Sequence, residues 1–339
     1  MPPLRIVILR ADHLGDMILT TPLVRALGKA GHEVTVVGPR AWAAVWEGNP
    51  WARYAALEEA CPQWPRHWFR LAGWLYRNGF DHLLVPYYEP RLFLASFFSG
   101  IRHRACQMGR YLGRLTLHTA LRTHLETQPR HMTEVWLDYA RHLGIQPASA
   151  APELFLADDE KAAVQAMLDQ QLPDPEPLVV IHPFHKGSTC HPPLETYVAV
   201  ARQLLGRGRC RIAITGTAGD LSSWQTAAGD LIHPRLWLAI GALSLRQLFA
   251  VIAQARVLVA GSTGPLHIAS ALGVPSVSPF CPHPAVSPQL WGNLTPGSCA
   301  VEAAENLCAR RCGQDPAGCG ALSDIQPGTL GAKVERLLC

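Results

Sequence analysis

The sequence lacks any long run of apolar residues and any block of consecutive basic residues. No window reaches the roughly 18 uncharged apolar residues that a membrane-spanning helix requires. The first apolar run soon meets charged residues, so it is typical of a first β-strand and not of a signal peptide. The net charge of +4 is too small, and the basic residues are too scattered, to indicate a nucleic-acid-binding protein. These absences predict a cytoplasmic protein without a nucleic-acid partner.

The chain is also poor in charge. Asp, Glu, Lys and Arg make up 17% of it, against 48% hydrophobic residues. That balance is typical of a folded globular protein and excludes an intrinsically disordered one. Its 339 residues exceed the usual size of one hydrophobic core, so two domains are expected.

Short runs rich in Val, Ile and Leu alternate with segments of helical period, a pattern typical of parallel strands covered by helices on both faces. Strands are expected at residues 5–9, 33–37, 82–85, 178–182, 211–215, 236–239, 257–260 and 276–279. Helices are expected at residues 17–28, 65–77, 91–98, 133–143, 159–168, 194–205, 222–230, 244–254, 265–272 and 328–338. Pro-rich stretches between residues 146 and 177 predict a domain boundary. The expected domains are residues 1–172 and 173–339, each an α/β unit with a Rossmann-like parallel sheet.

One region of the N-terminal half contains no acidic residue. It runs from Pro90 to Leu125. Its cationic side chains are Arg91, Arg102, Arg104, Arg110, Arg114 and Arg122, with His103, His118 and His124 among them. This predicts a local cationic surface.

A strand, a glycine turn and a helix follow one another between Arg10 and Pro22. Gly15 permits the sharp turn, and Asp16 falls in the first helical turn, at the carboxyl edge of the sheet where open α/β folds bind ligands. Asp16 is therefore a candidate catalytic residue. The alternative is that its carboxylate only complements the helix dipole, and placement alone does not separate the two.

A second strand, turn and helix run from Val257 to Gly273. Gly261, Ser262, Thr263 and Gly264 form the turn, and Pro265 occupies the first helical position. Free N–H groups and the positive end of the helix dipole make such a terminus a phosphate site, which the two hydroxyls and His267 could join. A capped structural helix with a core histidine is the alternative.

The loop after the strand at residues 178–182 carries Lys186, Gly187 and Ser188. Lys186 and Ser188 are candidates for contact with a diphosphate, although a lysine in a loop is most often only solvated.

Four blocks together resemble glycosyltransferase family 9, the family of the lipopolysaccharide heptosyltransferases. They are Gly15 to Pro22, the strand end His182-Pro183, Gly216 after a strand, and Ser262 to Pro275, in the right order over nearly the whole chain. The resemblance implies a GT-B fold with two Rossmann-like domains facing a central cleft, the last helix packing back on the N-terminal domain. It also implies an inverting glycosyltransferase that requires no cofactor or metal and uses ADP-heptose as its usual donor.

The resemblance also implies roles for individual residues. Asp16 corresponds to the general base, which takes the proton of the acceptor hydroxyl. Asp220 corresponds to the acid that faces the ribose, and Leu243 lies near the adenine. The expected donor-binding residues are Lys186, Ser188, Gly216, Asp220, Leu243, Ser262, Thr263, Gly264 and His267.

Two departures from the family pattern concern the donor side. Ser262 stands where an acidic residue often opens the second block, and Cys190 to Pro193 replaces a stretch of the form Lys/Arg-x-Trp-Pro. The loss of that cation leaves the donor sugar open, and Lys186 is the candidate to supply the charge instead.

By the same resemblance, the cationic region faces an anionic glycolipid or glycan acceptor. Arg102, Arg104, Arg110 and Arg114 are expected to bind its phosphates and carboxylates. Leucines at positions 112, 115, 117 and 121 could touch a bilayer surface. The protein would then bind peripherally to the inner face of the inner membrane. Packing of a helix on its own sheet is the alternative for these leucines.

Cys299, Cys308, Cys312 and Cys319 form a cluster near the C-terminus. Four thiolates could ligate zinc or iron, but the spacing lacks a paired Cys-x2-Cys unit. Free thiols or a local disulfide are expected here, and no metal.

Two other functions remain open for the sequence. A sugar-nucleotide epimerase of the same fold would need further acid and base residues in place of an acceptor groove. A non-catalytic nucleotide-sugar or glycan-binding homologue would agree with the two departures, whereas the presence of Asp16 argues against it.

Overall fold

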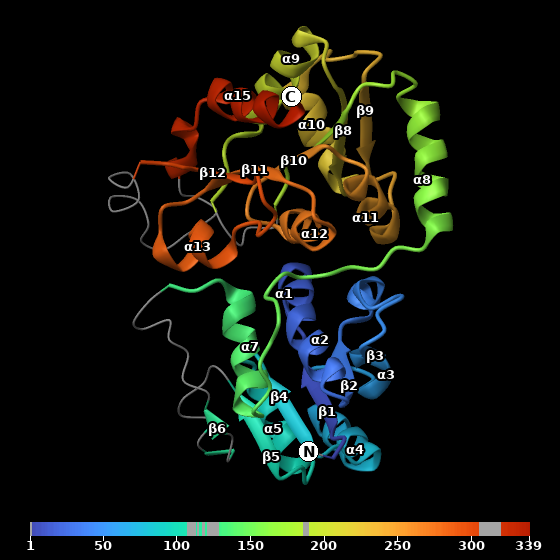
Figure 1. The fold of residues 1–339 in the computed structure, drawn as a ribbon, viewed down its shortest axis with the longest axis vertical. Helices are drawn as coiled ribbons and strands as arrows, with labels where there is room; N and C mark the ends of the chain where they lie inside the picture. Colours follow the sequence, from blue (N-terminus) through green and yellow to red (C-terminus); the bar gives the residue numbers. More distant parts are fainter. Residues whose placement is uncertain are drawn as a thin grey trace. The chain divides into compact units, whose positions relative to one another are not determined.

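The computed structural model describes residues 2–106, 113, 115–116, 119–120, 129–185, 190–304 and 320–339. The chain forms two compact units, Met1–Phe155 and Leu156–Cys339. Each unit has a six-stranded sheet in which all paired strands are parallel (Figure 1). The predicted α/β class with two parallel sheets is therefore confirmed. Among the described helices, none is long and apolar enough to cross a membrane.

The sheet of the first unit has the strand order β3-β2-β1-β4-β5-β6. The strands are β1 (Arg5–Leu9), β2 (Glu33–Gly38), β3 (Ala52–Ala56), β4 (His82–Val85), β5 (His103–Cys106) and β6 (Thr119–Ala120). Four consecutive residues of the central β1 are buried, because helices cover both faces of the sheet. Val7 and Leu9 face one of the two layers and join its hydrophobic core.

The helices of the first unit form two layers. They are α1 (Leu14–Leu19), α2 (Thr21–Lys29), α3 (Leu57–Ala60), α4 (Trp68–Asn78), α5 (Pro90–Phe98) and α7 (Met132–His142). Helices α4 and α5 pack together over one face, and α2 and α7 over the other (Figure 1). The sequence predicts one helix at residues 17–28, whereas the structure divides this segment at Thr20, whose hydroxyl donates to the Asp16 carbonyl at 2.8 Å.

The sheet of the second unit has the order β12-β11-β10-β7-β8-β9. Its strands are β7 (Leu178–His182), β8 (Arg211–Gly216), β9 (Leu236–Ile240), β10 (Val257–Ala260), β11 (Ser276–Phe280) and β12 (Cys299–Glu302). Its helices are α8 (Asp158–Gln171), α9 (Leu194–Arg207), α10 (Leu221–Ala228), α11 (Leu245–Ala253), α12 (Gly264–Leu272), α13 (Pro288–Trp291) and α15 (Pro327–Leu338). Alternate residues of β7, Val179 and Ile181, lie in its main core.

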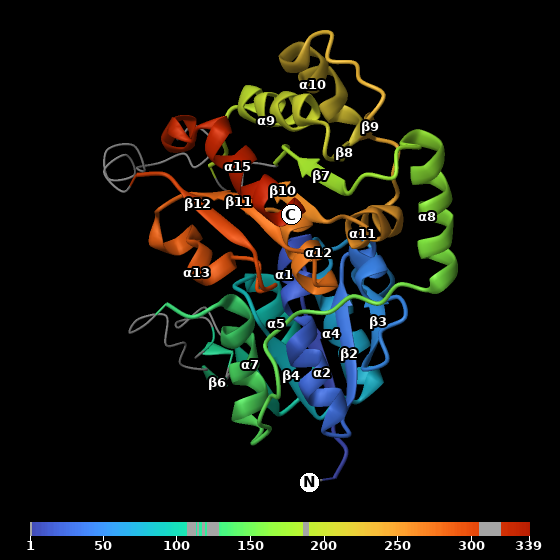
Figure 2. The same cartoon turned by 45° about the horizontal axis from the view of Figure 1, so that its top comes forward.

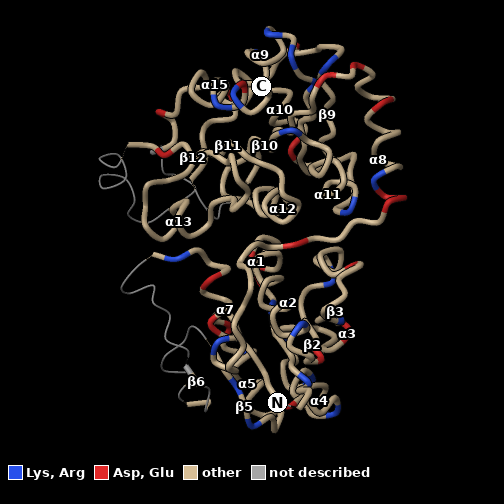
Figure 3. Tube along the Cα trace, in the orientation of Figure 1, with Lys and Arg blue, Asp and Glu red and all other residues tan. Residues whose placement is uncertain are grey.

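The chain divides after Phe155, whereas the sequence places the boundary between residues 172 and 173. The difference is α8, which packs on α11 of the second unit (Figure 2). Its acidic first turn, red in Figure 3, includes Glu160, which forms a two-pronged ion pair with Arg246 of α11 (Nε–Oε1 2.7 Å). The two residues of this ion pair are far apart in the sequence. The Pro-rich stretches alone could therefore not reveal that α8 belongs to the second unit.

The last helix belongs to the second unit, where α15 packs on α9, β10 and β11. Its return to the first unit, which the family resemblance implies, stays a prediction. Leu330 and Val334 are fully buried on its inner face, with both side chains in the main core of that unit. The apolar face of α15 is thus covered within its own unit.

We expect Leu330→Ala to lower the free energy of unfolding of the second unit by about 2–5 kcal/mol, because it leaves a cavity under α15. Chemical denaturation measures this quantity. Arg336→Ala on the exposed face of the same helix is the control and should change the unfolding free energy by less than about 0.5 kcal/mol. Equal effects of the two substitutions would contradict the packing described here.

Candidate functional site

Both sheets reverse their strand order at the centre. In the first unit β1 lies between β2 and β4, and in the second β7 lies between β8 and β10. Open α/β sheets bind ligands outside the carboxyl ends of the strands at such a reversal. Functional residues are therefore expected in the segments that follow β1 and β4 in the first unit, and in those that follow β7 and β10 in the second.

A cluster of three charged residues follows β1. Arg10 is fully buried, and its Nη2 atom lies 2.8 Å from Oδ1 of Asp16. Its Nε atom lies 3.0 Å from Oδ1 of Asp12. The guanidinium carbon lies 4.2 Å from the ring centroid of Trp136, which α7 contributes. The buried Arg10 guanidinium thus lies within ion-pair distance of two carboxylates.

The backbone around this cluster is fixed by short-range contacts. The Arg10 amide donates to the Val37 carbonyl at 2.8 Å, and the Trp42 indole donates to the Asp12 carbonyl at 2.9 Å. At Gly38, a Cβ would lie 2.5 Å from the Arg10 carbonyl oxygen. Glycine at the end of β2 therefore permits the close approach of the loop that carries the carboxylates.

Burial dominates the electrostatics of this cluster. It raises the pKa of Asp12 to about 6, with Arg10 opposing the rise and Asp16 adding to it. Burial also raises the pKa of Tyr87, which follows β4, and the negative charges of Asp12 and Glu89 contribute. The site therefore collects carboxylates and a phenol from the two strands that flank the reversal.

The Asp16 side chain is partly exposed at the carboxyl edge of the sheet. The exposed fraction of the Asp16 side chain is 18%, whereas that of the Arg10 side chain is zero. Helix α1 has no side-chain cap, and the Asp16 carboxylate pairs with Arg10, so it does more than complement the helix dipole. The sequence did not assign roles to Arg10 and Asp12. An arginine and an acid directly after a buried strand were the available signal.

In the second unit, the loop between β10 and α12 presents backbone amides. Thr263 is the N-cap residue of α12 and makes no side-chain cap, and its hydroxyl donates instead to the Gly261 carbonyl at 3.3 Å. The amide groups of the first helical turn are therefore not taken up by a capping side chain. Behind them His267 is buried, with its ring edge-on to Trp291 at 6.3 Å between centroids.

Histidines lie beside this loop, at the end of β7. The rings of His185 and His191 stack at 3.9 Å between centroids, and a Cβ at Gly261 would lie 2.6 Å from His191. The His182 ring contacts the Thr215 hydroxyl at 3.0 Å, and burial lowers its pKa to about 4. Burial likewise lowers the pKa of His191 to about 3. The His191 imidazole thus packs against Gly261 of the phosphate-loop candidate, and it lies in the segment that replaces Lys/Arg-x-Trp-Pro.

The residues predicted to bind the nucleoside follow β8 and β9. Asp220 accepts hydrogen bonds from the amide and the hydroxyl of Thr217, both at 2.7 Å. A Cβ at Gly216 would lie 2.6 Å from the Phe184 ring, so this glycine permits a tight approach of the two loops. Leu243 is half-buried after β9.

The remaining predicted residues are not all in one place. Arg102 is exposed, whereas Arg104 on β5 is buried, donates to the Ile101 carbonyl and lies 5.7 Å from the Phe97 ring. Burial lowers the pKa of Arg104. Lys186, Ser188, Arg110, Arg114, Cys308, Cys312 and Cys319 lie outside the described residues.

One cysteine of the C-terminal cluster lies within the described residues. Cys299 on β12 is a half-buried free thiol. In the part of the chain that the structure describes, no three His, Cys, Asp or Glu side chains are arranged to hold a metal ion.

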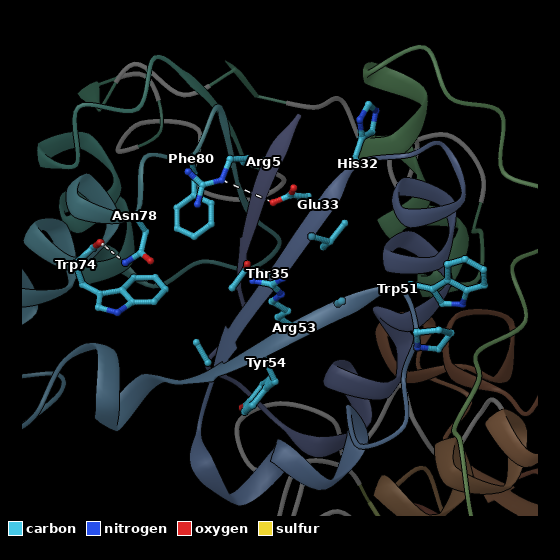
Figure 4. Close-up of a pocket in the computed structure, with 14 residues that line it drawn as sticks. Arg5, His32, Glu33, Thr35, Trp51, Arg53, Tyr54, Trp74, Asn78 and Phe80 are labelled. Carbon is cyan, nitrogen blue, oxygen red and sulfur yellow. Dashed lines mark hydrogen bonds and ion pairs between the residues drawn. The ribbon is translucent and has the colours of Figure 1, made fainter. Parts of the chain in front are cut away.

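A separate cavity of about 450 Å³ lies in the first unit between α4 and strands β2 and β3 (Figure 4). Arg5, Glu33 and Arg53 line it from the sheet, and Trp74 and Phe80 line it opposite. Arg5 is engaged there, since it donates to the Gly79 carbonyl at 3.1 Å and lies 3.9 Å from Glu33. Because Arg5 and Glu33 begin their strands, this cavity lies away from the carboxyl edge that carries Asp16.

Solved structures resemble the chain over nearly its whole length. A glycosyltransferase of family 9 from Veillonella parvula superposes with a TM-score of 0.79 at 20% identity, covering 99% of this chain and 97% of the other. The E. coli ADP-heptose LPS heptosyltransferase II has a TM-score of 0.78 at 20% identity, covering 98% of each chain. E. coli heptosyltransferase WaaC with ADP has a TM-score of 0.71 at 16% identity, covering 98% and 99%. At these identities the likeness establishes the fold.

The family model of glycosyltransferase family 9 (heptosyltransferase) matches residues 68–315. No protein with a curated description matches the sequence. The match covers most of the chain and confirms the resemblance seen in the sequence. The chain therefore belongs to glycosyltransferase family 9 and is a glycosyltransferase of the GT-B fold.

Proposed function

We propose that this glycosyltransferase moves a heptose or a related sugar from an ADP-sugar to a lipopolysaccharide core or similar glycan acceptor, with inversion. Two solved relatives support the donor, since one is named for ADP-heptose and the other is a heptosyltransferase with ADP. The observation that carries the proposal is the carboxylate of Asp16, held by buried Arg10 at the strand-order reversal of the first unit.

Asp16 acts as the general base of the transfer. Its partly exposed carboxylate takes the proton of the acceptor hydroxyl as that oxygen forms a bond to the anomeric carbon of the donor. The bond between the anomeric carbon and the phosphate oxygen breaks on the opposite face, and ADP leaves with its electron pair. The attack from that side accounts for inversion, and no metal is needed for the proton transfer.

The second unit binds the donor and stabilises the charge that develops on the leaving phosphate. The Gly264 amide, the Ser262 hydroxyl and the His267 ring supply the anion site. The Thr263 amide donates to the Gly261 carbonyl at 2.8 Å, and it would exchange this bond for one to the phosphate. Lys186 and Ser188 are proposed to add contacts to the diphosphate. Asp220 and Leu243, with Gly216 between their loops, bind the nucleoside, for which a carboxylate is a suitable acceptor of ribose hydroxyl groups.

The first unit binds the anionic acceptor through arginines. Arg102, Arg110 and Arg114 are proposed for this role. Arg104 is a weaker candidate, because its guanidinium is buried against Phe97 and the Ile101 carbonyl. A glycolipid acceptor would place the enzyme in the cytoplasm with peripheral contact to the inner face of the inner membrane.

Asp16→Asn should leave the fold intact and lower transfer by about 10²–10⁴-fold, since the amide cannot accept the proton. The measurement is ADP release from ADP-heptose in the presence of a lipopolysaccharide core acceptor, with the melting temperature recorded alongside. Glu59→Gln, which removes an exposed acid from α3, is the control and should keep full activity. Unchanged turnover in Asp16→Asn would remove Asp16 from the mechanism.

The same assay separates the alternatives. An epimerase would convert ADP-heptose without any acceptor, whereas the proposed enzyme releases ADP only when an acceptor is present. A non-catalytic homologue would bind ADP and release none from the donor under either condition.

ADP should raise the melting temperature of the protein more than UDP or GDP does, because a ligand that binds only the folded state stabilises it. Asp220→Asn should weaken ADP binding by roughly tenfold through the loss of a charged hydrogen-bond acceptor. Asp230→Asn, an exposed acid that follows the neighbouring α10, should leave it unchanged. A larger shift with UDP or GDP would exclude ADP as the donor nucleotide.

A further inference from the structure

Asp12 and Asp16 share a single counter-charge. The Nε and Nη2 atoms of Arg10 reach different carboxylates, at 3.0 and 2.8 Å. Arg10 has no exposed surface, and its guanidinium lies over the face of Trp136. Because Arg10 cannot turn to solvent, a change of charge on either carboxylate is felt by the other.

We propose that Asp12 is a second proton-binding residue of this site, a positioning residue whose charge sets the strength of Asp16 as a base through Arg10. The inference rests on the proposed function, in which Asp16 is the general base. It adds a pH-dependent control to that site.

The groups around Asp12 come from four segments of the first unit. Arg10 at the end of β1 and His13 before α1 favour its ionised form, whereas the Asp16 carboxylate disfavours it. Tyr87 after β4 feels the charge of Asp12 in turn. The Trp42 indole donates to the backbone carbonyl of Asp12 and so fixes the residue without satisfying its carboxylate.

Burial opposes ionisation of Asp12 more strongly than Arg10 favours it, which places its pKa at about 6. Above that pH Arg10, Asp12 and Asp16 together carry a net charge of −1. Below it Asp12 is protonated, and their net charge is zero. In the neutral state Asp16 alone balances Arg10 and is a weaker base. In the charged state the second negative charge repels the Asp16 carboxylate and makes it a stronger base.

The first test measures the titration of Asp12 directly, by ¹³C NMR of aspartate carboxyl groups in the full chain, with Asp12→Asn identifying the resonance. We expect a midpoint near pH 6 in the wild type and in Glu59→Gln. In Asp16→Asn the midpoint should fall by roughly one pH unit, because the repelling carboxylate is gone. A midpoint unchanged by Asp16→Asn, or near the ordinary value of about 3.9 in the wild type, would overturn the proposal.

The second test is the pH profile of kcat/KM with ADP-heptose and a lipopolysaccharide core acceptor. Asp12→Asn should lower kcat/KM at pH 7.5 by roughly three- to tenfold and flatten the profile between about pH 5 and 7.5. Asp12→Glu should restore the pH dependence, and Glu59→Gln should match the wild type. A wild-type profile in Asp12→Asn would refute the role of Asp12 even where Asp16→Asn is inactive. Retained activity in Asp16→Asn would instead refute the proposed function.

Stability gives a readout that is independent of activity. Because burial raises the pKa of Asp12 in the folded state to about 6, the contribution of this residue to stability is fully present below about pH 4 and is lost as the pH rises from there through about 6. Asp12→Asn has no such titration. Its melting temperature relative to the wild type should therefore rise between about pH 4 and 6 and stay level above that, and a constant difference from about pH 4 to 6 would contradict a raised pKa of Asp12.

Discussion

The first unit is organised around a guanidinium that has no access to water. A buried charge is tolerated only when partners replace the hydration it has lost, and Arg10 finds two carboxylates and an indole face. These partners belong to the end of β1, the start of α1, and α7, so the site is complete only when α7 is docked on the sheet. Positioning of Asp16 thus depends on the packing of the whole unit and not on one loop.

In the second unit the candidate site is one for an anion, and among the described residues it is not built around a buried ionised side chain. Its anion-binding candidate consists of backbone amides at the start of α12, which need no ionisable side chain to carry positive charge. The imidazoles beside it are held towards their neutral form by burial. In the proposed mechanism, one unit therefore uses a buried charge to hold the general base, and the other uses oriented backbone dipoles to bind the phosphate.

The elements that the sequence revealed are those with a strong local signal. Strands such as β1 and β10 are continuous apolar runs, and their fully buried positions explain why they were predicted. Strands β3 and β12 were missed because they lie at the edges of the sheets, where only part of each strand is buried and pairing with a neighbour defines it. Asp16 could be found from its glycine turn. The partnership of Arg10 with Asp12 could not, because spacing along the chain does not tell which side chains turn inward.

The location of α15 has a consequence for how such enzymes diversify. Because this helix stays with α9 and the second sheet, each unit is one uninterrupted stretch of chain, and the two join in the extended segment 151–157. A single genetic crossover after Phe155 would exchange an entire unit without dividing a strand or a helix. The architecture thereby allows one half to be replaced while the other keeps its own interior intact.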